Sequence, residues 1–242
     1  MAFRVKKLRA NADSKVASIF ESYKDRQAAF CAENDDVFAA IEATITTTND
    51  MGRLPLWNEY KNVANYGRVI DDNPKRKMAD VRTKSEFCQF YAWLVKQLKP
   101  EAVLEFGAAF GASGMYWLAG LNMCNRGKLY SFEPNDIWHP IALRNFDTVS
   151  DRHLLTLGTF EDNIGVIGEK VGISLIDAIH TRDFVVNQFE LVRKVSAKGA
   201  LVLFDDINFS QDMQDCWDEI SQSDEFQSVW QLSSRVGIVE LP

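Results

Sequence analysis

The sequence lacks the features of a disulfide-rich, membrane-spanning or strongly basic protein. It has only four cysteines, and none of them form the Cys-x-x-Cys pair typical of structural zinc sites. It has no run of about 18 or more apolar residues, which a membrane-spanning helix requires. Lysine and arginine number 27 against 34 aspartates and glutamates, for a net charge of −7. This balance counts against a general nucleic-acid binder, because such proteins usually present a basic face.

The N-terminus also lacks the signature of a secretory signal. Residues 1–12 are basic, but no apolar segment with a small-residue cleavage site follows them. A transit peptide stays open as an alternative on the basis of this charge. The cysteines are widely scattered, which favours buried free thiols in a reducing compartment: Cys31, Cys88, Cys124 and Cys216. We therefore expect a cytoplasmic protein with no membrane partner.

The chain changes character near residue 80. Residues 13–50 contain no glycine or proline and space their apolar side chains as a helix does, and we expect the threonine run 44–48 to end this pattern. Residues 52–80 are irregular and include a basic cluster at 75–77. We predict a helical or lid region at 1–80 and a main domain at 81–242. The N-terminal helices fit a lid or a dimer interface equally well.

After a further predicted helix at 85–98, short apolar runs alternate with helical patterns. Such alternation is typical of βαβ units in a parallel sheet covered on both faces. The last two strands follow one another closely and predict an antiparallel pair. We expect an α/β, Rossmann-like doubly wound sheet, mostly parallel with an antiparallel strand near one edge, plus an N-terminal helical layer. The predicted strands are 102–106, 128–132, 154–157, 173–176, 200–204, 227–232 and 235–240, and the helices between them 113–121, 139–149, 183–195 and 210–221.

A glycine-rich turn lies between the first of these strands and its helix, at residues 105–114 (EFGAAFGASG). A turn of this kind lets the backbone approach a ligand closely. It has no lysine, so it is not a nucleotide-binding P-loop, and Ala109 replaces the second glycine of a dinucleotide fingerprint. The remaining pattern, acid-x-Gly-x-x-x-Gly-x-Ser, resembles motif I of class I S-adenosylmethionine-dependent methyltransferases. A tight turn that binds nothing is the alternative.

This resemblance implies a set of cofactor contacts. Glu133, which ends the second strand, is placed to accept hydrogen bonds from a ribose diol. Phe160 and Glu161 follow the third strand, in the segment that flanks the adenine in such enzymes. The cofactor residues that we expect are Glu105, Gly107, Gly111, Ser113, Glu133, Phe160, Glu161 and Asp177.

Acidic residues and a histidine follow the next two strands. Asp177 and His180 come after one strand, and Asp205 and Asp206 come after the other. Neighbouring parallel strands end at the same edge of a sheet, so three carboxylates would converge there. Close like charges repel one another unless a cation neutralises them, and a hard ion such as Mg²⁺ prefers oxygen ligands.

The pattern Asp-x-x-His followed by Asp-Asp resembles the metal-dependent O-methyltransferases of the catechol O-methyltransferase type, over residues 85–206. The likeness is closer to the branch with sugar and other natural-product O-methyltransferases. It implies that Asp177, Asp205 and Asp206 bind Mg²⁺ and that His180 is the general base. Ile179 departs from the pattern, because catechol-type members often carry an aromatic residue there. Other readings are a structural histidine and helix caps at Asp177, Asp206 or Ser210.

Together these features predict a Mg²⁺-dependent O-methyltransferase that acts on a small hydroxylated metabolite such as a sugar, polyketide or aromatic natural product. The alternatives are a tRNA nucleoside O-methyltransferase, which the acidic composition disfavours, and a catalytically silent S-adenosylmethionine-binding protein. A NAD-dependent oxidoreductase lacks its fingerprint. Tyr66, Arg68 and the basic cluster 75–77 fit either contacts to an anionic or sugar acceptor or a solvated loop.

Overall fold

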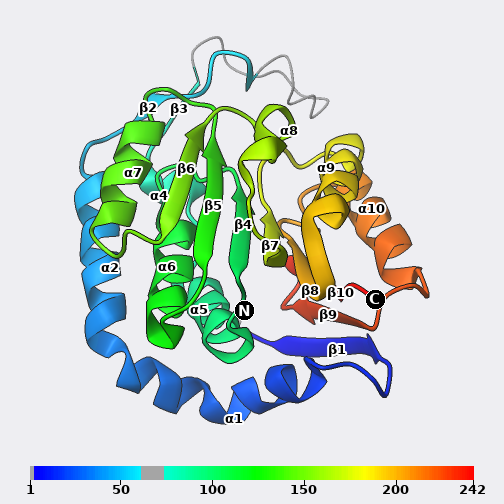
Figure 1. Cartoon of the computed structure of the whole chain (residues 1–242). Coiled ribbons are helices and arrows are strands. Elements are labelled where there is room, and N and C mark those ends of the chain that lie inside the picture. Colours follow the sequence, from blue (N-terminus) through cyan, green and yellow to red (C-terminus); the bar gives the residue numbers. More distant parts are fainter. Residues whose placement is uncertain (1–2, 61–73) are drawn as a thin grey trace.

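The computed structural model describes residues 3–60 and 74–242, and its centre is a sheet in which eight of the described strands pair (Figure 1). The expected α/β sheet is confirmed: five neighbouring strands are parallel, and the strands beyond them pair antiparallel. The parallel strands, in spatial order, are β6 (His153–Leu157), β5 (Lys128–Glu133), β4 (Ala102–Phe106), β7 (Val171–Ile176) and β8 (Ser196–Phe204). Next come β10 (Val236–Glu240), β9 (Ser228–Leu232) and β1 (Val5–Ala10).

Helices cover both faces of the sheet, which is why its central strands are apolar on both sides. All five residues of β4 are buried, as parallel strands between two helical layers require. One layer contains α5 (Ser85–Leu98), α6 (Ala112–Cys124) and α7 (His139–Asp147). The other contains α8 (Phe160–Asn163), α9 (Arg182–Val195) and α10 (Gln211–Gln222), and a 3₁₀ turn (Ile164–Val166) follows α8. Figure 1 shows the two layers on opposite sides of the strands.

The N-terminal helical pattern is confirmed as two helices, α1 (Ala17–Glu33) and α2 (Asp35–Asn49), which pack outside α5 and α6. The expectation that the threonine run ends the pattern was wrong, because α2 continues through it to Asn49. The hydroxyls of Thr44, Thr46 and Thr47 each donate to the carbonyl four residues earlier in the helix. The threonine hydroxyls thus find partners within the helix, and the packing of α2 against α6 holds the β-branched residues in helical conformation.

Strand β1 was not predicted from the sequence. Its residues VKKLRA read as a basic terminal segment, yet they pair antiparallel with β9, with Val5 opposite Leu232 and Lys7 opposite Trp230. A strand so rich in lysine and arginine suits the edge of a sheet, because charged side chains discourage further pairing. This edge of the sheet is therefore formed by a strand near the start of the chain that pairs with a strand near its end.

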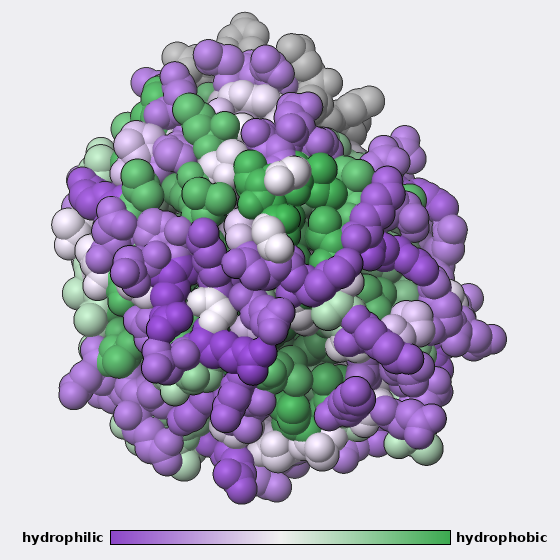
Figure 2. Space-filling view, viewed as in Figure 1, coloured by the Kyte–Doolittle hydropathy of each residue, from purple (hydrophilic) through white to green (hydrophobic). Residues whose placement is uncertain are grey.

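The described parts of the segment 52–80 contain short elements. Strands β2 (Leu54–Pro55) and β3 (Lys75–Arg76) pair with each other, and α4 (Met78–Val81) follows. Tyr66 and Arg68, two of the residues considered for acceptor contacts, lie outside the described residues. No described helix combines the length and apolar character needed to cross a membrane. The face shown in Figure 2 is mostly polar, with apolar side chains gathered in its upper and lower halves.

Candidate active site

A cavity of about 620 Å³ opens at the carboxyl ends of the parallel strands. This is the edge where ligands bind in open α/β sheets. The turns after β4, β5, β6, β7 and β8 line it, and so does the N-terminal segment around β2, β3 and α4. A volume of this size suits one or two small ligands.

The glycine-rich turn after β4 forms the floor of this cavity through Gly107 and Ala109. Gly107 has φ +73°, and a Cβ there would overlap the carbonyl oxygen of Asp177. Ala109 also adopts the left-handed region, at φ +49°, and Gly111 does so at φ +89° as the residue before α6. The turn therefore brings backbone close to the end of β7 and to the cavity.

The other predicted residues of the turn lie beneath the cavity rather than in its wall. Glu105, Gly111 and Ser113 are buried and are not among the residues that line the cavity. Burial raises the pKa of Glu105 to about 7, although the hydrogen bond that Ser131 donates to its Oε2 at 2.8 Å opposes the shift. The structure places these residues as supports of the turn.

Glu133 lies where a ribose-binding acid was expected, at the end of β5 and in the cavity wall. Its Oε2 accepts a hydrogen bond from the backbone N–H of Ala109 at 2.6 Å, and its Oε1 accepts one from Asn135 at 2.8 Å. Burial raises the pKa of Glu133 to about 8 despite these two donors. The side chain is thus held rigidly against the glycine turn.

Phe160 and Glu161 also line the cavity, at the start of α8. The ring of Phe160 is almost fully buried against Phe106, with 4.2 Å between the ring centroids. Glu161 accepts a hydrogen bond from Gln188 at 3.0 Å. Both side chains therefore have structural partners in addition to their place in the cavity wall.

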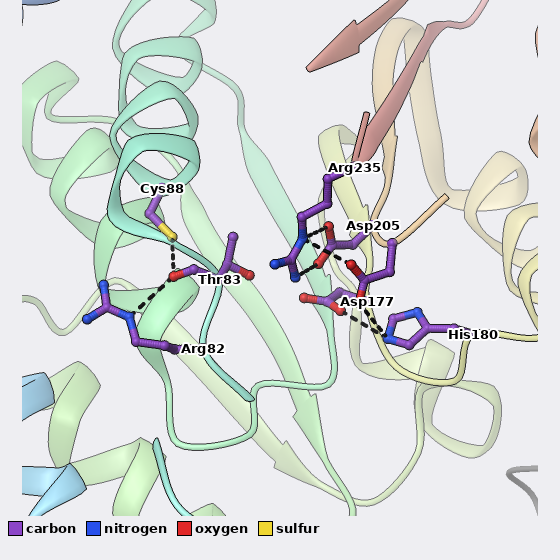
Figure 3. Close-up of polar contacts among 8 residues, drawn as sticks. Arg82, Thr83, Cys88, Asp177, His180, Asp205 and Arg235 are labelled. Atoms are coloured by element: carbon purple, nitrogen blue, oxygen red, sulfur yellow. Dashed lines mark hydrogen bonds and ion pairs between the residues drawn. The ribbon is translucent and has the colours of Figure 1, made fainter. Parts of the chain in front are cut away.

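Asp177 and His180 stand together at the end of β7 (Figure 3). The Nε2 atom of His180 lies 3.8 Å from Oδ1 of Asp177 and 3.6 Å from Oδ2 of Asp206. Burial lowers the pKa of His180, outweighing the neighbouring carboxylates. Burial and the charge of Asp205 raise the pKa of Asp177 well above its ordinary value. The imidazole is therefore neutral near pH 7 and able to accept a proton.

Arg235, which sequence reasoning missed, is the cation of this cluster (Figure 3). It stands just before β10, and its Nε and Nη2 donate to the two carboxylate oxygens of Asp205 at 2.8 and 2.6 Å. Its Nε also lies 3.1 Å from Oδ1 of Asp206. Burial alone would raise the pKa of Asp205, but the paired guanidinium outweighs it and holds the pKa below its ordinary value. A single arginine in a hairpin turn is not part of a recognisable sequence motif. Only the three-dimensional structure shows that it contacts Asp205 and Asp206.

The structure brings the three predicted metal ligands to one place but does not present them equally. Asp177 and Asp206 line the cavity, whereas the Asp205 side chain is fully buried and is not part of the wall. Within residues 3–60 and 74–242, no group of three or more His, Cys, Asp or Glu side chains has a metal-binding arrangement. Of the residues considered as helix caps, Ser210 is one: its hydroxyl accepts a hydrogen bond from the backbone N–H of Met213 at the start of α10.

The remaining wall of the cavity is aromatic and basic. Trp57, Tyr60, Phe184 and Phe209 line it, together with Arg76 from the basic cluster. Trp57 and Arg76 come from the N-terminal segment, which therefore closes one side of the site. In the sequence, the irregular and aromatic composition of the segment 52–80 was the only sign that it contributes to the site.

The sequence matches a known family in the part that builds this cavity. Residues 104–207 match Methyltransf_24, a family described as a methyltransferase domain. No curated protein sequence matches the chain.

Similar solved structures are methyltransferases. The O-methyltransferase TomG from Streptomyces achromogenes, in complex with SAM and involved in tomaymycin synthesis, has 14% identity and a TM-score of 0.57, covering 67% of this chain and 82% of TomG. An O-methyltransferase from Bacillus cereus in complex with SAH has 18% identity and a TM-score of 0.55, with 67% and 85% covered. The SAH-bound methyltransferase PaMTH1 from Podospora anserina has 13% identity and a TM-score of 0.59, with 82% and 94% covered.

These likenesses establish the fold, and the family match covers β4 through the end of β8, where the glycine turn, Glu133 and the Asp177–His180 pair are found. Residues 104–207 thus match a methyltransferase domain family, and the chain has the Rossmann-like fold of the S-adenosylmethionine-dependent methyltransferases that it resembles.

Proposed function

We propose that this methyltransferase transfers the methyl group of S-adenosylmethionine to a hydroxyl of a small acceptor, with His180 as the general base. The observation that carries the proposal is the position of His180, which lines the same cavity as Gly107 and Glu133. A cofactor bound along the glycine turn and a proton acceptor for the nucleophile would then share one space. Positioning of this kind accelerates a two-substrate reaction strongly.

The proposed reaction is an in-line displacement. The acceptor oxygen forms a bond to the methyl carbon as the carbon–sulfur bond breaks, and the electron pair of that bond goes to sulfur. The hydroxyl proton goes to Nε2 of His180, which its buried surroundings keep neutral. The carboxylate of Asp206 stabilises the imidazolium that forms, because its Oδ2 lies 3.6 Å from Nε2.

The cavity and the similar structures support a small hydroxylated acceptor such as a sugar, polyketide or aromatic natural product. Trp57, Tyr60 and Phe209 contribute aromatic side chains to the cavity wall, and Arg76 contributes a basic one. TomG is involved in tomaymycin synthesis, and a further similar structure is a putative caffeoyl-CoA O-methyltransferase from Staphylococcus aureus, with 14% identity and a TM-score of 0.58. We also propose that the part of the N-terminal region that lines the cavity, around Trp57 and Arg76, forms a lid over this acceptor.

The Mg²⁺ dependence implied by the family resemblance stays a prediction. Asp177, Asp205 and Asp206 are the side chains that would hold the ion. Their arrangement does not fit it, because Arg235 binds both oxygens of Asp205 and Asp205 does not reach the cavity. No step of the proposed reaction therefore depends on a metal ion.

The test combines cofactor binding with a screen for acceptors. We expect calorimetry to show one S-adenosylhomocysteine per chain, and we expect hydroxylated aromatics, sugars or polyketides to release S-adenosylhomocysteine from S-adenosylmethionine. Absence of cofactor binding would overturn the proposal. Cofactor binding without turnover across the panel, or turnover on tRNA in the same assay, would instead support one of the other readings.

A further inference from the structure

We infer that Arg235 is the fixed cation of this active site, held by the acidic motif in place of a divalent metal ion, and that methyl transfer requires no metal. This inference rests on the proposed O-methyl transfer. It also gives the Asp205-Asp206 pair a purpose different from metal binding, namely to hold a guanidinium at the wall of the cavity.

The first argument is the position of the charged side chains relative to the cavity. Arg235 and Asp206 line the cavity, whereas the Asp205 side chain has no exposed surface and lies in the core behind the wall. A metal ion bound from the cavity would need the oxygens of Asp205, and these oxygens already accept two hydrogen bonds from Arg235 at 2.8 and 2.6 Å. A bidentate guanidinium–carboxylate pair is among the strongest charged hydrogen-bonded contacts in proteins. The guanidinium, rather than an ion, thus stands between Asp205 and the cavity.

The second argument is that the backbone holds Arg235 in this place. The backbone N–H of Ile207, just beyond Asp206, donates to the carbonyl of Arg235 at 2.9 Å. Strand β10 then continues antiparallel along β8, with Gly237 opposite Phe204. The arginine and the two aspartates are therefore fixed relative to one another through main-chain hydrogen bonds as well as through their side chains.

The third argument is electrostatic. A cation neutralises the repulsion of close carboxylates, which was the reason to expect Mg²⁺ here. Arg235 already supplies a positive charge to Asp205 and Asp206, and a divalent ion beside it would be repelled. Its Nη1 has no hydrogen-bond partner among the described residues, so this nitrogen is available to donate to the acceptor oxygen. A fixed donor of this kind stabilises negative charge that develops during a reaction.

The experiment is a calorimetric titration of Mn²⁺ and Mg²⁺ into metal-free protein saturated with S-adenosylhomocysteine. We expect no saturable binding to the wild type. Arg235→Met removes the cation and should create saturable Mn²⁺ binding that the wild type lacks, because the carboxylates then have no positive charge beside them. Adding Asp206→Asn to this variant should abolish the new binding. Arg193→Met is the matched control, because Arg193 forms a similar two-bond pair with Glu225 away from the cavity.

Each outcome decides the inference. Stoichiometric metal binding by the wild type that Asp206→Asn removes would overturn it, as would an Arg235→Met protein that folds and gains no metal binding. If Arg235→Met does not fold, the wild-type titration still decides, and Arg235→Lys, which keeps the charge, should also bind no metal. Failure of S-adenosylhomocysteine to bind would remove the proposed function, whereas metal binding by the cofactor-saturated protein would remove only this inference.

Discussion

At the scale of single residues, buried acidic side chains have raised or lowered pKa values according to whether a cation lies beside them. Glu105, Glu133 and Asp177 have pKa values raised by burial. Asp205 is equally buried, but Arg235 faces it and its pKa is lowered instead. One paired guanidinium thus outweighs desolvation, because a buried charge with a hydrogen-bonded partner is far less costly than one without. We therefore expect ionisation of the acids whose pKa is raised by burial to affect folding stability and ligand binding.

Glu133→Gln should weaken S-adenosylhomocysteine binding about tenfold or more, since an amide loses one acceptor for the ribose diol. Its effect on stability should depend on pH. The folded-state pKa, about 8, lies above the ordinary value of 4.5. Glu133 therefore favours folding below about pH 4.5, and this contribution is lost as the pH rises through about 8.

Urea unfolding of the cofactor-free proteins at pH 6 and pH 9 measures this difference. The wild type should lose more unfolding free energy between the two pH values than Glu133→Gln does, because the amide cannot ionise. Equal losses in the two proteins would show that Glu133 does not titrate in this range.

His180→Ala should lower turnover by about 100-fold or more while S-adenosylhomocysteine binding stays within about twofold of the wild type. The reason is that His180 is proposed to accept the proton and not to hold the cofactor. Steady-state kinetics with an acceptor from the screen, together with calorimetry, separates the two effects. His153→Gln is the control, because His153 pairs with Asp147 beside α7. A His180→Ala enzyme with normal turnover would remove the histidine from the mechanism.

The connection from β4 through the glycine turn to α6 is the element that organises the site. The turn depends on left-handed backbone at Gly107 and Gly111 and on the close approach of Gly107 to Asp177 at the end of β7. It therefore joins the proposed cofactor side of the cavity to the acidic cluster. A change in this turn should disturb both, whereas the same change elsewhere should cost only backbone strain.

Gly107→Ala should abolish S-adenosylhomocysteine binding, because its Cβ would overlap the carbonyl of Asp177 and force the turn apart. Gly199→Ala is the matched control. Gly199 has nearly the same φ, +74° against +73°, but nothing lies within 4 Å of its Cβ position. The control should lose about 1 kcal/mol of stability from strain and retain cofactor binding. Calorimetry and thermal unfolding test the pair, and equal behaviour of the two variants would contradict the close-contact explanation.

At the scale of the whole molecule, the N-terminal region is tied to the sheet domain at both ends. Strand β1 completes the sheet beside β9, and Trp57, Tyr60 and Arg76 complete the cavity wall. Between them, Glu42 on α2 contacts α6 and the segment after α4. It accepts hydrogen bonds from Arg82 at 2.8 and 2.7 Å and from Tyr116 at 2.8 Å.

Glu42→Ala should lower the free energy of unfolding by about 1–2 kcal/mol, because it leaves Arg82 and the buried hydroxyl of Tyr116 without this partner. Glu33→Ala is the control. Glu33 pairs with Lys96 at 3.8 Å and is mostly exposed, so its loss should cost less than about 0.5 kcal/mol. Denaturant unfolding of both variants provides the measurement, and similar losses would show that the Glu42 cluster is no more than a surface contact.

The sequence by itself determined the features that depend on local patterns. Strand β4 and helix α5 begin and end at the predicted residues, because an apolar run bounded by breakers and a helical spacing are local signals. The glycine turn, Glu133 and the Asp177–His180 pair were also identified, since each is a short motif at the end of a strand. The methyltransferase family could be inferred from these motifs and their order.

Tertiary structure alone decided the features that join distant segments. Strand β1 forms because β9, more than 200 residues later, offers an unpaired edge. The threonine run stays helical because α2 packs against α6 and its buried Thr48 hydrogen-bonds with Asn145 on α7. Arg235 meets Asp205 and Asp206 only because β10 folds back along β8. The acids were visible in the sequence, but the charge that faces them was not, because electrostatic partners are chosen by distance in space.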